Sequence, residues 1–210
     1  GRPGASSGLP VPEKGAAAGK RKERYKVADT LVLDLETQKT FDDVGGRNRL
    51  YLMRVSLVGI FSYDKNAFRT YTEWEAPSLR GVLEEAGLVV GFNIKRFDYP
   101  VLEPYVKKSL RDIPTLDMME DVQRHLGHRL SLDSLVKETL GEGKTGHGLD
   151  AIRFFREGRL EELKSYCLAD VRLTRDLFEY GKQNGHIKYQ KNGQSLSIPV
   201  NWKDRVPVSS

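Results

Sequence analysis

Cysteine is almost absent from this chain of 210 residues. Cys167 is the only one, which excludes an internal disulfide and a zinc site built from cysteines. No apolar run approaches the ~18 residues of a membrane span, and the first residues lack the apolar stretch of a secretory signal peptide. These absences predict a cytoplasmic protein that does not cross a membrane.

Positive charge is concentrated at the N-terminus. Residues 1–26 hold seven Lys or Arg residues and two Glu residues, which accounts for the whole net charge of +5. The rest of this segment is mostly Gly, Ala, Pro and Ser, which cannot build a core, so we predict a disordered basic tail. Its cluster at residues 20–26 either contacts phosphates or belongs to a linker whose charge is incidental.

The remaining residues, 27–210, are expected to form one α/β domain. Alternating and compact apolar runs predict strands at 30–35, 51–63, 68–73, 88–92 and 113–116. Apolar spacings of three and four residues predict helices at 78–86, 100–107, 118–125, 131–140 and 159–182. Two alternating stretches around Asn192-Gly193 predict a C-terminal β-hairpin over 186–199. Antiparallel strands followed by alternating strands and helices predict a mixed sheet with helices packed on its faces.

Two carboxylates lie close together at the end of the first predicted strand. Asp34 and Glu36 are two residues apart in Thr-Leu-Val-Leu-Asp-Leu-Glu, so they share a face of the strand. Two carboxylates that point the same way repel each other and resist burial. A divalent cation would hold them there because hard cations prefer oxygen ligands. The alternative is a strand end that runs into solvent.

A second polar stretch follows the apolar run at 88–92. The chain turns through Asn93, and Phe97-Asp98 come just before a helix that Pro100 can open. Asp98 is either the N-cap of that helix or a site residue, because open α/β sheets place their sites beyond the carboxyl ends of central strands.

The third stretch lies on the long predicted helix. Tyr166 and Asp170 are four residues apart and therefore share a face beside the apolar stripe. Taken alone, both residues could simply pack against a neighbouring element.

These three stretches together resemble the three exonuclease motifs of the DEDD superfamily, in the tyrosine-containing (DEDDy) subgroup. The residues that carry the resemblance are Asp34-Leu35-Glu36, Asn93 with Phe97-Asp98, and Tyr166 with Asp170. The sequence is most similar to the proofreading exonuclease domain of family-B DNA polymerases and to its stand-alone bacterial relatives, over about residues 28–182. The resemblance implies a ribonuclease H-like fold, and it does not cover the C-terminal hairpin. Because no polymerase domain fits in the remaining length, we expect a free-standing nuclease.

The resemblance also implies a mechanism. Two divalent cations, Mg²⁺ or Mn²⁺, would be held by four carboxylates: Asp34, Glu36, Asp98 and Asp170. They would support in-line hydrolysis of a phosphodiester bond. Tyr166 would orient the attacking water, since a tyrosine pKa near ~10 makes a poor base at neutral pH. Thr37, Asn93 and Phe97 would position the terminal nucleotides.

The expected function is therefore 3′–5′ exonuclease activity on single-stranded DNA. An exoribonuclease would use the same residues, because none of them reads the 2′-hydroxyl. A catalytically silent nucleic-acid-binding module is the alternative of a different class, and the intact set of site residues argues against it. A helicase or a repair protein is a candidate partner.

Overall fold

The computed structural model describes residue 1 and residues 28–143 and 148–206. The tail predicted over residues 1–26 therefore lies outside the described residues, apart from residue 1.

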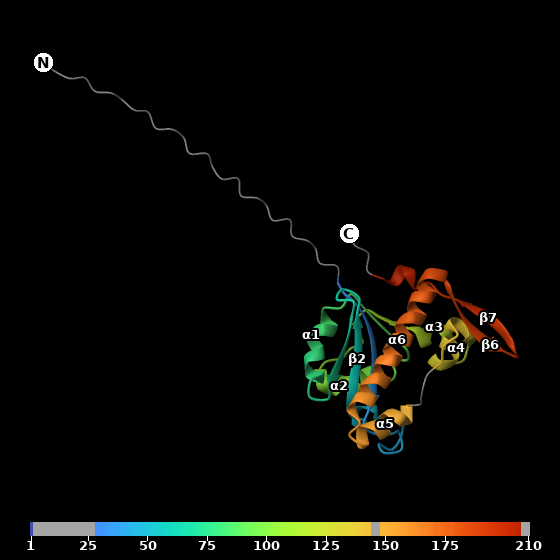
Figure 1. Cartoon of the computed structure of the whole chain (residues 1–210), viewed down its shortest axis with the longest axis horizontal. Coiled ribbons are helices and arrows are strands. Elements are labelled where there is room, and N and C mark those ends of the chain that lie inside the picture. Colours follow the sequence, from blue (N-terminus) through green and yellow to red (C-terminus); the bar gives the residue numbers. More distant parts are fainter. Residues whose placement is uncertain (2–27, 144–147, 207–210) are drawn as a thin grey trace.

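Five strands form one mixed sheet in the order β3-β2-β1-β4-β5 (Figure 1). They are β1 (Thr30–Thr37), β2 (Val55–Ser62), β3 (Ala67–Thr72), β4 (Leu88–Gly91) and β5 (Thr115–Asp117). β2 pairs antiparallel with β1 and with β3, whereas β4 pairs parallel with β1 and with β5. The predicted mixed sheet is confirmed, and β1 is its central strand.

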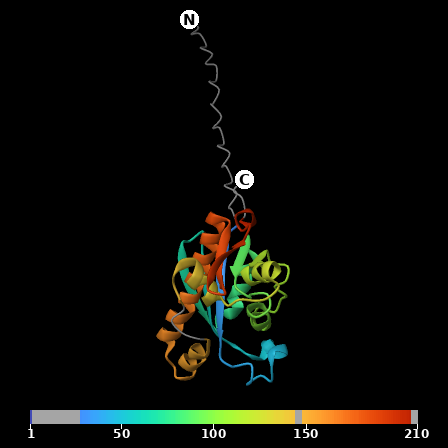
Figure 2. The ribbon, with the colours of Figure 1, turned by 90° about the vertical axis from the view of Figure 1, so that its right-hand side faces the viewer.

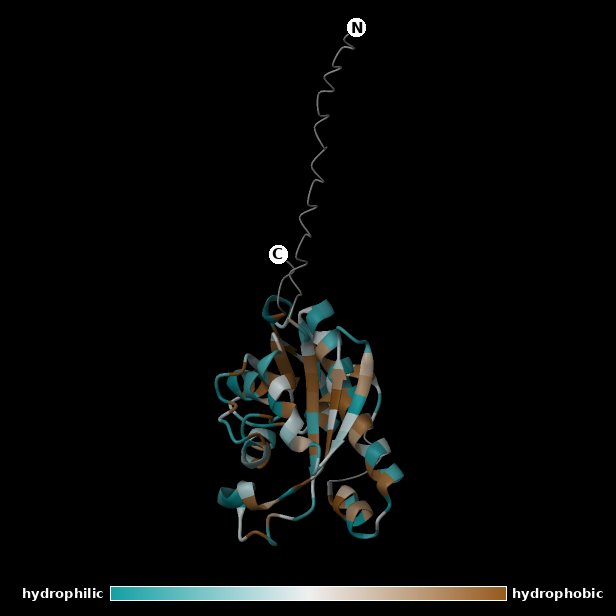
Figure 3. Ribbon diagram, turned by 90° about the vertical axis from the view of Figure 1, so that its left-hand side faces the viewer, coloured by the Kyte–Doolittle hydropathy of each residue, from teal (hydrophilic) through white to brown (hydrophobic). Residues whose placement is uncertain are grey.

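Helices cover both faces of this sheet (Figures 1 and 2). The helices are α1 (Leu79–Glu84), α2 (Asp98–Val106), α3 (Met118–Leu126), α4 (Leu132–Leu140), α5 (Gly148–Arg156) and α6 (Leu160–Asn184). Figure 3 shows apolar residues concentrated along the central strands and hydrophilic residues on the outer helical surfaces. The predicted helix-flanked architecture is therefore confirmed.

The alternation of β1 decides which side chains meet which helices. Leu31, Leu33 and Leu35 belong to the apolar cluster that contains residues of α1 and α2. Val32 belongs to a second cluster, with residues of α6. Because strand side chains alternate between faces, Asp34 and Glu36 share the face of Val32 and point toward α6.

The predicted C-terminal hairpin is also confirmed. It consists of β6 (His186–Lys191) and β7 (Gln194–Pro199), which pair antiparallel as a separate two-stranded sheet. Asn192 and Gly193 have φ angles of 52° and 77°, as the type I′ turn of a two-residue hairpin requires.

Some predicted boundaries were wrong. The strand expected over 51–63 begins only at Val55, and the residues before it form a 3₁₀ segment, η1 (Arg47–Leu52). Arg54 has a left-handed backbone (φ 58°), so an extended strand cannot continue through it. The helix expected from Pro100 begins two residues earlier, at Asp98.

Three short elements were not predicted. They are α5 and two further 3₁₀ segments, η2 (Ala76–Ser78) and η3 (Lys203–Arg205). In α5 the apolar pattern is misleading, because Leu149 is 68% exposed and only Ala151 and Ile152 are buried.

Candidate active site

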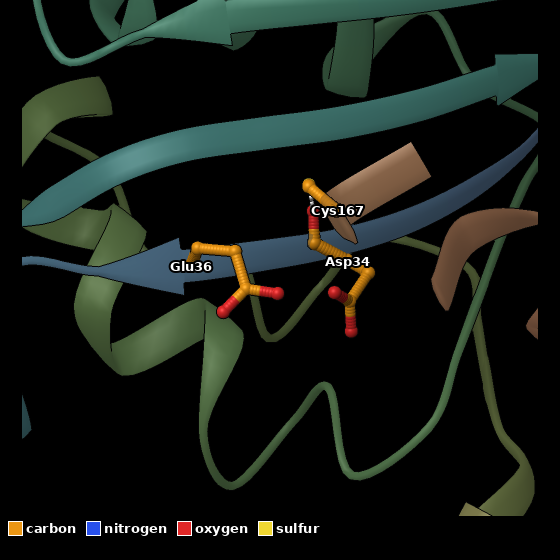
Figure 4. Close-up of side chains that lie close together, drawn as sticks. All are labelled: Asp34, Glu36 and Cys167. Carbon is orange, nitrogen blue, oxygen red and sulfur yellow. Dashed lines mark hydrogen bonds between the residues drawn. The ribbon is translucent and has the colours of Figure 1, made fainter. Parts of the chain in front are cut away.

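β1 presents two carboxylates at its carboxyl end. Asp34 pairs across the sheet with Gly59 and Glu36 with Leu57, and the register shifts directly after Glu36. Figure 4 shows both side chains on the same side of β1, with Cys167 from α6 beside them. One oxygen of each carboxylate and the Cys167 sulfur all lie within 4.8 Å of one another.

Asp98 reaches β1 from the neighbouring segment. β4 pairs with β1 only as far as Val32, so the N–H of Leu35 needs another acceptor. The Asp98 carboxylate accepts that hydrogen bond (3.1 Å), and its side chain is buried. Asp98 is therefore not the N-cap that one interpretation of the sequence predicted; the N-cap is Phe97.

Burial and the charge of Asp34 raise the pKa of Asp98 well above its ordinary value of 3.8. The causes are the loss of water around the carboxylate and the nearby like charge. The hydrogen bond from Leu35 thus places Asp98 beside β1 at the residue next to Asp34.

α6 supplies the third part of the site. Tyr166 and Asp170 are both buried, one helical turn apart. Burial, followed by the charges of Asp170, Glu36 and Asp34, raises the pKa of Tyr166. The phenol is therefore protonated at neutral pH and lies among the carboxylates of both β1 and α6.

A glycine on β2 allows this close approach of α6. A Cβ atom added at Gly59 would meet Val171 Cγ2 at 2.8 Å and Cys167 Sγ at 2.9 Å. Both distances are shorter than ordinary van der Waals contact. Gly59 therefore allows α6 to pack closely against the sheet beside Asp34, which is the cross-strand partner of Gly59.

The lone cysteine, Cys167, is buried beside Asp34 and Glu36. Burial raises the pKa of the Cys167 thiol well above its ordinary value of 9.0. The charges of four carboxylates raise it further: Glu36, Asp34, Asp170 and Asp98. The Cys167 sulfur lies 3.9 Å from the Asp34 carbonyl oxygen, to which it can donate. The carboxylate oxygens around it are the ligands that Mg²⁺ and Mn²⁺ prefer.

The predicted substrate residues are divided between two places. Thr37 and Phe97 line a cavity of about 320 Å³ beside Glu36, with Leu149 and Ile152 of α5 on another side. Asn93 does not line this cavity. Its backbone N–H donates to the Asp117 carboxylate (2.8 Å), in a turn where Asn93 has a φ of 65°.

Sequence reasoning missed two residues near the site. Phe41 lines the same cavity, with its ring centroid 5.9 Å from that of Phe97 and with the Arg47 guanidinium 4.4 Å from its own centroid. An aromatic residue inside a polar loop was the available signal. Asp150 of α5 makes a smaller contribution to the raised pKa of Tyr166, and no motif indicated it.

A mixed sheet of this order, with carboxylates gathered where its central strand ends beneath a long helix, defines a ribonuclease H-like protein. The profile of the RNase_H superfamily matches residues 31–181, and the chain belongs to that superfamily. The ribonuclease H-like fold that the resemblance implied is thereby confirmed. Membership indicates nuclease chemistry that uses divalent metal ions and acts on nucleic acid.

A solved structure shares the fold. The structure of the family B DNA polymerase from the hyperthermophilic archaeon Pyrobaculum calidifontis matches with a TM-score of 0.56 and 16% sequence identity. The match covers 84% of this chain and 25% of the polymerase chain, so this chain spans about a quarter of that protein. A comparison of the sequence with curated proteins finds no match. Among the described residues, no helix is both long and apolar enough to cross a membrane.

Proposed function

We propose that this chain is a metal-dependent 3′–5′ exonuclease that acts on single-stranded DNA. The observation that carries the proposal is the close approach of Asp34 and Glu36 on β1, with Asp98 bonded to the N–H of Leu35 between them and with the helix that carries Asp170 packed beside them at Gly59. Like charges in a buried site destabilise one another unless cations offset them. This group would hold two Mg²⁺ or Mn²⁺ ions, which would offset the charge of the phosphate and lower the pKa of water.

Tyr166 has the position and protonation state for orienting water. Its raised pKa keeps the proton on the phenol, so the hydroxyl donates a hydrogen bond and does not act as a base at neutral pH. In the proposed reaction the hydroxyl holds the attacking water in line with the scissile phosphate.

The cavity beside Glu36 supports a terminal nucleotide as the substrate group. Its volume of about 320 Å³ is at the lower end of the ~300–1,000 Å³ of small-ligand sites. This space suits one nucleoside better than a base pair with two backbones. Phe41 and Phe97 offer aromatic faces for the base, and Thr37 lies beside the sugar in this arrangement. Asn93, which lies outside the cavity, would contact the next nucleotide.

Incubation with 5′-labelled single-stranded DNA or RNA, in Mg²⁺, Mn²⁺ or EDTA, tests the proposal on a sequencing gel. We expect a ladder that shortens from the 3′ end, and we expect EDTA to abolish it. The Asp34→Asn variant is the matched control for loss of the metal site, because it keeps the size of the side chain and removes one negative charge. Internal cleavage products, or activity that persists in EDTA, would contradict the proposal. The RNA arm decides between the deoxyribonuclease and the exoribonuclease.

A further inference from the structure

Trp74 stands out among the exposed apolar side chains of the described residues. It is 90% exposed, in the turn after β3, whereas Trp202 is 1% exposed. Tryptophan has a large apolar ring, and exposure of nearly the whole ring to water is unfavourable. Single exposed apolar residues are common on protein surfaces, so the surroundings of Trp74 must show whether the exposure serves a purpose.

The turn that carries Trp74 is held rigidly on both sides. The Glu73 carboxylate accepts hydrogen bonds from Gln38 Nε2 (2.8 Å), from Arg54 (2.8 Å) and from the Tyr105 hydroxyl (2.7 Å). On the other side, the Glu75 carboxylate accepts from the N–H and the hydroxyl of Thr72, both at 2.9 Å. The two acidic neighbours of Trp74 are thus engaged in bonds of their own, and the indole is presented on a fixed backbone.

The same bonds place this turn near the candidate active site. Gln38 and Arg54 are the two ends of the segment that connects β1 to β2, so Glu73 ties the turn to that segment. The register runs from Glu36 to Leu57 on β2 and on to Thr72 on β3. Two strand spacings separate Thr72 from Glu36, roughly 10 Å. Trp74 therefore follows β3 at the end of the sheet that holds the carboxylates.

The connecting segment adds one further exposed ring, a second exposed apolar side chain and positive charge. Tyr51 is 59% exposed and Leu52 is 40% exposed. Residues 38–54 include four basic and two acidic residues. Within the part of the chain that the structure describes, Arg47 and Arg49 make no ion pair, whereas Arg153 and Arg156 of α5 each do.

Exposed aromatic rings beside basic side chains that lack acidic partners are the features of a single-strand binding surface, where rings stack on bases and cations track the phosphates. We propose that Trp74, with Tyr51 and Arg49, forms a second contact for single-stranded nucleic acid, beyond the terminal nucleotides held at the carboxylates. This inference rests on the proposed function. A turn whose backbone is already held in place lowers the entropic cost of binding, since no loop ordering is then needed.

Intrinsic fluorescence gives a direct test, because the chain contains two tryptophans and Trp202 is buried. The titration uses oligothymidylate or oligouridylate of about twelve nucleotides, within the ~4–16-nucleotide range of such sites, in EDTA to prevent cleavage. We expect quenching of wild-type emission and no quenching of the Trp74→Phe variant, which retains only Trp202. A blunt DNA duplex, whose bases are already stacked, is expected to give no quenching.

Affinity and cleavage complete the experiment. Trp74→Ala is expected to weaken binding of the twelve-nucleotide strand about 5- to 100-fold, whereas Trp74→Phe keeps a ring and most of the affinity. Cleavage of a dinucleotide, too short to reach Trp74, is expected to be unchanged in both variants. Unaltered affinity of Trp74→Ala, or absence of wild-type quenching by both DNA and RNA strands, would overturn the inference. Failure of the proposed function would look different: wild-type protein would cleave neither the dinucleotide nor the longer strand with either metal.

Discussion

Two opposing effects act on the ionised form of the Asp98 carboxylate. The N–H of Leu35 stabilises its ionised carboxylate, whereas burial and Asp34 raise its pKa well above 3.8. The folded chain therefore binds this proton more tightly than the unfolded chain does. In the absence of metal, stability is lost as the pH rises from about 4 through the raised folded-state pKa.

Asp98→Asn should separate these effects. The amide oxygen can still accept from Leu35, but the side chain no longer titrates. In EDTA we expect the melting temperature of the variant to rise relative to that of the wild type, and by more at pH 7 than at pH 4. We expect activity with Mg²⁺ to fall about 10²-fold or more. An equal difference in melting temperature at both pH values would show that the raised pKa does not affect stability.

Tyr166→Phe removes one oxygen and keeps the buried ring. Single-turnover cleavage should fall roughly 10–10³-fold, at or below the ~10²–10⁴ of a positioned proton-transfer group, with the melting temperature near that of the wild type. Tyr63→Phe is a matched control, because it also removes one tyrosine hydroxyl. That hydroxyl donates to Glu179, and the Tyr63 backbone N–H donates to Thr30, the first residue of β1, away from the carboxylates. If Tyr166→Phe cleaves at the wild-type rate while Asp170→Ala is inactive, the Tyr166 hydroxyl has no role in the reaction and the prediction is wrong.

At the scale of elements, the site depends on the distance between α6 and the sheet. β1 carries two carboxylates, and α6 carries Tyr166 and Asp170. These elements are separated by more than a hundred residues and meet where Gly59 has no side chain. The packing of one helix against one strand thus determines whether the acidic groups converge.

Gly59→Ala should therefore affect both stability and activity. The added methyl group would clash with Val171 and Cys167, and overpacking of this kind costs about 1–3 kcal/mol of unfolding free energy. We expect cleavage to fall as well, even at temperatures where the variant is fully folded. The control is Gly81→Ala in α1, where the Cβ would meet nothing within 4 Å; it should stabilise the protein by roughly 0.5–1 kcal/mol. Full activity in a folded Gly59→Ala variant would contradict the prediction.

At the scale of the whole molecule, the segment after the hairpin belongs to the core. Trp202 is buried and stacks on Phe178 of α6 with ring centroids 6.2 Å apart. Its indole N–H donates to Asp121 of α3 (2.8 Å). Figure 1 shows this end of the molecule opposite to α5, whose residues line the cavity beside Glu36.

Trp202→Ala should lower the unfolding free energy by about 3–5 kcal/mol, as for other large-to-small core substitutions. That loss corresponds to a fall in melting temperature of roughly 2–4 °C per kcal/mol for a chain of this size. Cleavage rates at low temperature should stay near the wild-type value, because the change lies away from the carboxylates. A folded Trp202→Ala protein with wild-type stability, measured by urea unfolding, would show that the segment only lies on the surface.

Local pattern was sufficient to predict much of this protein. The alternation around Asp34 predicted a strand with two carboxylates on one face, and the Asn192-Gly193 pair predicted the hairpin, because both depend on neighbouring residues alone. The order of the elements predicted the mixed sheet. The motifs in the order seen here pointed to the superfamily, which the match over residues 31–181 confirms. The roles of the individual site residues stay predictions.

Tertiary structure decided what no local pattern encodes. The sequence left open whether Asp98 capped a helix, and only the early end of β4 shows that its carboxylate bonds to Leu35 instead. Phe41 and Phe97 line the same cavity, and Trp202 lies in the core against Phe178. Both arrangements depend on contacts between residues far apart in the chain. Such contacts depend on the relative positions of packed elements, which are set by the sum of many weak interactions and not by periodicity within any one segment.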